Sequence, residues 1–110
     1  MGLDQYAFTR RQDEEDTYII QWRKHANLEG WMSELYYAKG GNAESFNCVE
    51  LSLDKDDLLR LKDEYQNLQT AKGSFWGVSG KYEETQTGRF IESAIQAIDD
   101  GYEIVYLSWW

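Results

Sequence analysis

Apolar and polar residues alternate along the chain at spacings that predict where strands and helices form. Residues 3–9 are typical of a first strand, which the polar run over residues 10–16 ends. The acidic sequence DEED at residues 13–16 then provides an N-cap and negative charge for a helix over about residues 15–25. Arg23, Lys24 and His25 stand at the far end of this predicted helix, where the helix dipole favours positive charge.

The centre of the chain predicts two further helices with a strand between them. Asn27 is a suitable N-cap for the second helix, and Gly40 and Gly41 end it. The apolar residues of this helix recur at helical spacing, namely Leu28, Trp31, Met32, Leu35 and Tyr36. Residues 46–53 predict the next strand, and Asp54 caps a third helix with an apolar stripe of its own.

The last third of the chain predicts a loop, a helix and a strand. Residues 72–82 (KGSFWGVSGKY) are rich in glycine and aromatic side chains, which favours a loop or an irregular hairpin. A fourth helix over about residues 84–100 ends at Gly101, which suits the position after a helix C-cap. Residues 102–109 form a strand that is apolar on both faces, and such a strand belongs inside a sheet or at an interface.

The order of these elements is strand, helix, helix, strand, helix, loop or hairpin, helix, strand. It predicts an α+β fold, a small sheet of three or four strands with about four helices. A chain of 110 residues can bury roughly 65% of its unfolded surface, so we expect one domain over residues 1–110. Because Cys48 is the only cysteine, this domain must fold without a disulfide or a thiolate metal site.

The amino-acid composition disfavours several classes of function. The formal net charge of −9 disfavours direct binding to nucleic acid, because phosphate contacts need clustered lysine and arginine. The single cysteine indicates a reducing, cytoplasmic setting. The sequence contains neither a signal peptide nor a membrane-spanning apolar run, so we expect neither secretion nor membrane contact. Aromatic residues make up 15% of the chain, which leaves side chains to spare for a binding surface.

The basic and aromatic segment around His25 has two interpretations. Trp22 can point inward while Arg23, Lys24 and His25 only complement the helix C-terminus. Alternatively, the segment forms a site for an anion or a partner, in which His25 titrates near neutral pH and Trp22 or Trp31 supplies an apolar wall. Trp76 in the glycine-rich loop and Trp110 at the chain end are further candidates for such a site.

Two further segments resemble known binding motifs but lack residues that those motifs require at fixed positions. The segment over residues 73–81 resembles a phosphate-binding loop, but Phe75 and Tyr82 stand where that motif requires a glycine and a hydroxyl residue. The acidic group Asp54, Asp56 and Asp57 lacks the glycine and glutamate of a calcium loop, and helix capping explains it.

Catalysis has no identifiable context in the sequence. Nothing orients Cys48 and His25 as a nucleophile and base, so we predict no catalytic residue, no metal site and no cofactor.

The final LSWW is more unusual, because two tryptophans at a chain end either complete the core or form an exposed patch. We expect one tryptophan in each of these roles.

Several segments together resemble a known family. The opening MGLDQY, the central WRKHANLEGWM, FNCVEL, the glycine and aromatic loop and the final YLSWW are similar to a family of short proteins of tailed bacteriophages, including cyanophages. Ala26 stands where relatives tend to have proline. Some members carry a phosphoglycerate kinase label, which this chain cannot support because it is too short for that two-domain enzyme and lacks a nucleotide-binding loop. The resemblance implies phage origin and action in the host cytoplasm.

Two functions follow as hypotheses. The first is a non-enzymatic phage accessory protein that binds a host protein, for host takeover or against a defence system. One version is a nucleic-acid mimic that uses the acidic residues Asp13, Glu14, Glu15, Asp16, Asp54, Asp56 and Asp57. The second is a binder or sponge for a small anionic ligand around Arg23, Lys24 and His25. Formation of a homo-oligomer stays open in both.

Overall fold

The computed structural model describes residues 3–67 and 81–110, which form an α+β fold. The strands are β1 (Asp4–Arg10), β2 (Thr17–Arg23), β3 (Leu51–Leu53) and β4 (Glu103–Trp109). The helices are α1 (Ala26–Ala38), α2 (Lys55–Glu64) with the 3-10 turn η1 (Tyr65–Asn67), and α3 (Lys81–Asp99). The predicted fold class is confirmed, although the described residues form three α-helices instead of about four. The loop predicted over residues 72–82 lies largely outside the described part of the chain.

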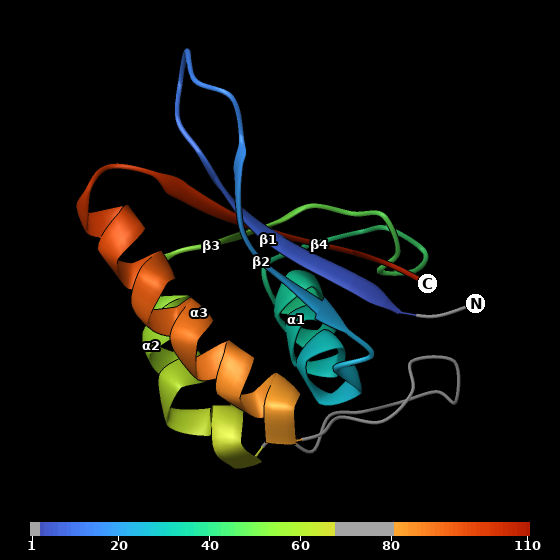
Figure 1. The fold of residues 1–110 in the computed structure, drawn as a ribbon. Helices are drawn as coiled ribbons and strands as arrows, with labels where there is room; N and C mark the ends of the chain where they lie inside the picture. The colour runs from blue at the N-terminus through green and yellow to red at the C-terminus, as the bar shows by residue number, and fades with distance from the viewer. Residues whose placement is uncertain (1–2, 68–80) are drawn as a thin grey trace.

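The strands form one antiparallel sheet in the order β2-β1-β4-β3. Its two central strands come from opposite ends of the chain, with Asp4 of β1 opposite Trp109 of β4. Both termini therefore lie at the same end of the sheet (Figure 1). Of the two places predicted for the last strand, inside a sheet or at an interface, the structure shows the first, because β4 lies between β1 and β3.

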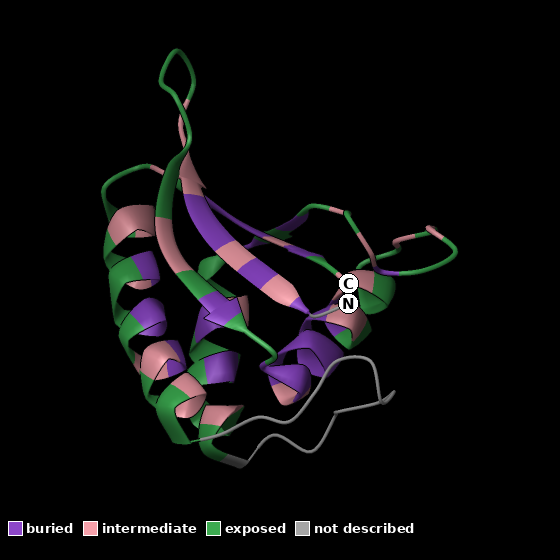
Figure 2. Ribbon diagram, turned by 45° about the vertical axis from the view of Figure 1, so that its right-hand side comes forward, coloured by how far each residue is buried: buried purple, intermediate pink, exposed green. Residues whose placement is uncertain are grey.

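All three helices cover one face of the sheet (Figure 1). The core between them contains side chains from every described strand and α-helix: Ala7, Trp22, Leu28, Trp31, Met32, Leu35, Leu51, Leu53, Leu58, Leu61, Phe90, Ile91, Ala94, Ile104 and Tyr106. Figure 2 shows the buried faces of α2 and α3 turned toward the sheet and their outer faces exposed. Apolar burial of this kind is the main favourable term in folding.

The helix predicted over residues 15–25 is wrong, because residues 17–23 form the strand β2. The run of Thr17, Tyr18, Ile19 and Ile20 is β-branched and aromatic, which favours a strand. The acidic sequence before it forms the β1–β2 hairpin turn, in which Asp13 has a φ of 66°. Arg23 and Lys24 consequently stand at the end of a strand, so the explanation of these cations as partners of a helix dipole is also wrong.

The strand predicted over residues 46–53 is limited to Leu51–Leu53. Cys48 has a φ of 59°, which interrupts the extended conformation. The preceding segment still follows β4, because the Cys48 amide donates to the carbonyl of Ser108 over 2.8 Å. Asn47 adds a side-chain bond to the carbonyl of Trp110 over 3.0 Å.

The local signals at Asp54, Gly40 and Gly101 act at the helix ends as predicted. Asp54 forms a capping box with Asp57 at the start of α2. Gly40 and Gly101 have positive φ values of 96° and 95° and follow the C-caps of α1 and α3. Each belongs to a Schellman motif, as in the bond from the Tyr102 amide to the Ala97 carbonyl over 3.0 Å. The N-cap predicted at Asn27 is wrong, because α1 begins at Ala26 and its N-cap is His25.

Candidate functional site

The face of the sheet opposite the helices carries an aromatic cluster. Successive residues of a strand point to opposite faces, so the strand residues that alternate with the core residues belong to this side. We call it the open face and define it by Tyr6 and Phe8 of β1, Tyr18 of β2, and Leu107 and Trp109 of β4. In the described part of the chain, no helix packs on it (Figure 1).

The rings of the open face contact one another across three strands. Tyr6 lies at the centre, with its ring centroid 5.1 Å from that of Trp109 and 5.8 Å from that of Tyr18. Phe8 meets Tyr18 edge-on at 5.7 Å. Distances of this size are those of aromatic pairs that stabilise one another, so the cluster has a defined arrangement.

A groove of about 440 Å³ follows this cluster along β2, lined by Tyr6, Tyr18, Ile19, Ile20, Gln21 and Trp109. We call it the aromatic groove. The tyrosine at one side of it, Tyr18, is 68% exposed, and Trp109 is 44% exposed. Single exposed aromatic side chains are common, but these two lie on one groove beside Tyr6, and a contiguous aromatic patch is typical of a contact surface.

A β-bulge shapes the floor of the aromatic groove. Ala7 pairs with Ile20 and Phe8 pairs with Tyr18, so Ile19 is the extra residue on β2. A bulge bends its strand and increases the local twist. This irregularity re-aims Tyr18 toward Tyr6 and Phe8, and no spacing in the sequence could have predicted it.

Ion pairs surround the open face. Arg10 forms a two-bond contact with Glu50, with both nitrogen–oxygen distances 2.9 Å, and also pairs with Asp16 at 3.1 Å. Because β4 lies between β1 and β3, the Arg10–Glu50 pair crosses β4. The hydrogen bonds from Arg10 hold the pKa of the Glu50 carboxyl below its usual value. At the other end of the face, Arg23 lies 3.6 Å from Asp4.

A buried polar network lies on the opposite, helix-covered face. The carboxylate of Glu29 in α1 accepts hydrogen bonds from the Tyr106 hydroxyl at 2.7 Å, the Ser108 hydroxyl at 3.0 Å and the Trp110 indole at 3.1 Å. Burial raises the pKa of Glu29, while these donors act in the opposite direction. Sequence reasoning missed Glu29, because a glutamate in an amphipathic helix is usually exposed.

Gln5 extends this network to the start of α1. Its amide donates to the Tyr106 hydroxyl at 2.9 Å and to the His25 carbonyl at 3.0 Å, and its oxygen accepts from the His25 amide at 2.8 Å. The amide group of Gln5 thus fixes the turn between β2 and α1. The network satisfies polar groups inside the core, which indicates a structural role.

The predicted basic and aromatic candidates do not form one cluster. His25 is only 2% exposed, and burial lowers its pKa to about 4, so its ring is neutral at pH 7. Trp22 and Trp31 are core residues, whose indoles donate to Thr87 and Glu64. Arg23 and Lys24 are exposed. Trp110 is partly buried beside Glu29, and Trp76 lies outside the described residues.

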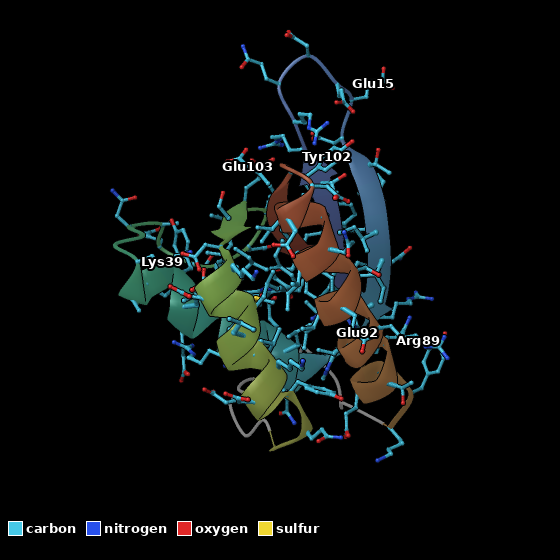
Figure 3. The ribbon with its side chains drawn as sticks, turned by 90° about the vertical axis from the view of Figure 1, so that its left-hand side faces the viewer. Glu15, Lys39, Arg89, Glu92, Tyr102 and Glu103 are labelled. Carbon is cyan, nitrogen blue, oxygen red and sulfur yellow. The ribbon has the colours of Figure 1, made fainter. Side chains whose placement is uncertain are left out.

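The acidic candidates divide into two groups. Asp13, Glu14, Glu15 and Asp16 belong to the β1–β2 hairpin turn, which projects beyond the sheet, and Figure 3 labels Glu15 on it. Arg11 holds the base of this hairpin, with its guanidinium 3.9 Å from the ring centroid of Tyr102 and 3.5 Å from the Glu14 carboxylate. Asp54, Asp56 and Asp57 occupy the start of α2, where Asp54 and Asp57 form the cap.

The residues that make the open face were only partly visible in the sequence. Trp109 was expected to face a partner or the core, whereas Tyr6 and Tyr18 were not candidates. The available signal was the apolar character of both faces of residues 3–9 and 102–109. It could not indicate a shared site, because only the pairing of β1 with both β2 and β4 brings these rings together.

Comparisons with known proteins place the chain in no family: no family model, curated protein or solved structure matches it. Over residues 3–67 and 81–110, no group of three or more histidine, cysteine, aspartate or glutamate side chains is arranged to hold a metal ion. None of the described helices combines the length and apolar character needed to span a membrane.

Proposed function

We propose that this protein is a non-enzymatic accessory protein of a tailed bacteriophage that binds a host protein through its open face. The observation that carries this proposal is the aromatic groove, with Tyr18 and Trp109 exposed beside Tyr6 on a sheet face that the described helices leave uncovered. Tyrosine and tryptophan dominate the energetic centres of protein interfaces, because they bury a large area at a low cost in conformational entropy.

Phage origin, action in the host cytoplasm and a role in host takeover or against a defence system rest on the sequence resemblance. The open face supports only the binding step of this proposal. A four-stranded sheet with one uncovered face offers a rigid surface, and rigid aromatic side chains lose little freedom when a partner covers them.

A binder of a small anionic ligand around Arg23, Lys24 and His25 has less support. Such a site requires these side chains to converge, but His25 is buried and neutral at pH 7 while Arg23 faces solvent beside Asp4. The anion would have to compete with the carboxylate of Asp4 for the guanidinium. We therefore place binding on the open face.

Nucleic-acid mimicry would rely on the hairpin and less on α2. Asp54 and Asp57 are engaged in the capping box, and Asp57 also pairs with Lys39 at 2.5 Å. Their charge is locally compensated, whereas Asp13 and Glu15 are exposed in the hairpin turn, on which Figure 3 labels Glu15. A partner of the open face can contact this hairpin as well, since only Thr17 separates Tyr18 from it in the chain.

Affinity capture tests the proposal. The tagged protein is incubated with host lysate at low and high salt, and bound proteins are identified by mass spectrometry. We expect the wild type to recover a host protein that the double variant Tyr18→Ala, Trp109→Ala does not recover. The double variant Arg23→Ala, Lys24→Ala is the control and should still recover it.

Circular dichroism melts of all three proteins verify that the variants fold. If the captured protein is lost with the basic variant and kept with the aromatic variant, the open face is not the binding surface, and the anionic site gains support. Recovery of no protein besides the tagged protein itself would count against a host-protein partner and favour the small-ligand alternative.

A further inference from the structure

The charge around the open face is predominantly negative. Two arginines there already face carboxylates of the same chain: Arg10 pairs with Asp16 and Glu50, and Arg23 with Asp4. The hairpin beside Tyr18 adds Asp13 and Glu15, and the whole chain has a net charge of −9. A partner surface that covers this face therefore meets an acidic rim, which attracts positive charge.

The rings inside this rim suit a cation. A guanidinium or ammonium group over an aromatic face is attracted to the ring, most strongly to tryptophan and tyrosine. The open face already holds one such contact, since the guanidinium of Arg10 lies 5.3 Å from the ring centroid of Phe8. Tyr18 and Trp109 are 68% and 44% exposed, so their rings are accessible to a side chain from outside.

The aromatic groove has the size for a short segment of chain. Its volume of about 440 Å³ lies within the range of ligand-binding clefts, roughly 300–1,000 Å³. Its lining is mostly aromatic and aliphatic, with Gln21 as a polar group. Long side chains such as arginine and lysine match this character, because they combine an apolar stem with a charged end.

We infer that the host protein docks with a basic segment, which lays arginine or lysine side chains on Tyr18 and Trp109 inside the acidic rim. This inference rests on the proposed function and specifies the chemistry of the partner. The aromatic groove binds the apolar stems and the cation faces the rings. The rim carboxylates, Asp4 among them, raise the rate of association and exclude acidic partners.

Three fluorescent ten-residue peptides test this inference on the intact protein. One alternates arginine with leucine, and the other two replace each arginine with glutamine or with glutamate. Fluorescence anisotropy titrations give the dissociation constant of each. We expect the arginine peptide to bind at least tenfold more tightly than the glutamine peptide, the glutamate peptide to bind weakest, and the preference to shrink in high salt.

Variants separate ring contacts from general charge attraction. Tyr18→Ala and Trp109→Ala should each weaken the arginine peptide by about two- to fivefold, as expected for the loss of an exposed cation–π contact. Tyr82→Ala is the matched control, because Tyr82 is 73% exposed on α3, away from the open face, and should change nothing. Asp4→Asn should also weaken binding, since it removes a rim charge and leaves Arg23 uncompensated.

Each result has a defined consequence. Equal binding of the arginine and glutamine peptides, with loss in the ring variants, would overturn the cationic partner and keep the open face as the binding surface. If neither Tyr18→Ala nor Trp109→Ala changes the affinity for the arginine peptide, the peptide binds by charge attraction alone, and the inference is overturned. If the arginine peptide does not bind although capture from lysate still depends on Tyr18 and Trp109, the inference fails and the proposed function stands. Failure of both assays rejects both.

Discussion

The hydroxyl of Tyr106 in β4 donates a hydrogen bond of 2.7 Å to Glu29 in α1, 77 residues away in the chain. The same hydroxyl accepts from the Gln5 amide at 2.9 Å, so it connects the two central strands to the helix beneath them. Tyr106 and Glu29 are both 0% exposed. The polar groups of this network are therefore satisfied by the protein itself, and removing one of them leaves its neighbours without compensation.

Tyr106→Phe should lower the free energy of unfolding by about 1–3 kcal/mol, because it leaves Glu29 with one donor fewer and removes an acceptor of Gln5. Chemical denaturation monitored by circular dichroism measures this loss. Tyr102→Phe is the control, since the Tyr102 hydroxyl makes only an exposed contact of 3.3 Å with Glu14. Equal stability losses in the two variants would show that the buried network contributes nothing specific.

His25 should make the protein less stable in acid. Its pKa is about 4 in the folded protein and about 6.5 in the unfolded chain, so the unfolded state binds a proton first as the pH falls. The contribution of His25 to stability is complete above about pH 6.5 and declines toward pH 4, by about 3 kcal/mol in total.

Denaturant titrations of the wild type and His25→Gln between pH 7 and pH 4 test this expectation. The variant should show a flatter decline of the unfolding free energy over this range. Glu29 has the opposite effect on the pH dependence of stability. Burial raises its pKa, so its contribution to the unfolding free energy falls as the pH rises. Parallel curves for the wild type and the variant would contradict the assignment to His25.

Truncation of two tryptophans should lower the stability by very different amounts. Trp31 is 2% exposed within the core, so Trp31→Ala should cost about 3–5 kcal/mol of unfolding free energy. Trp109 is 44% exposed on the open face, so Trp109→Ala should cost no more than about 1 kcal/mol while weakening partner binding. Thermal melts of both variants measure the contrast. A larger loss for Trp109→Ala would mean that the open face is part of the core.

Gly101 should be sensitive to a side chain. With φ at 95°, Gly101→Ala forces a left-handed conformation that costs about 1–2 kcal/mol. Gly101→Asn should cost less, because asparagine tolerates this conformation better. Urea denaturation of the two variants measures the difference, and a stabilising effect of the alanine would exclude the Schellman motif at the end of α3.

The capping box of α2 makes a further local prediction. Asp54→Ala removes the side chain that accepts from the Asp57 amide at 2.8 Å and should cost about 1 kcal/mol. Asp56→Ala changes a first-turn carboxylate outside the capping box and should cost at most about 0.5 kcal/mol. Comparable denaturation midpoints for the two variants would contradict the role of Asp54.

The sequence by itself determined the features that depend on neighbouring residues. The glycines after α1 and α3 and the cap at Asp54 act through bonds to residues only a few positions away. The apolar stripes of the helices and the two-sided apolar character of β4 follow from spacing alone. These signals were enough to predict the α+β class, which the structure confirms. They placed the last strand inside a sheet or at an interface, and the structure shows the first of these.

Only the tertiary structure decided the state of residues 17–23 and the composition of the open face. The acidic and basic residues at the two ends of that segment suit a helix, while its β-branched and aromatic run favours a strand, and pairing with β1 decides for the strand. That pairing turns Trp22 inward and Arg23 outward, disperses the predicted basic cluster and brings Tyr18 to Tyr6. Strand pairing depends on partners far away in the chain, such as Trp109 beside Tyr6, and no local pattern contains that information.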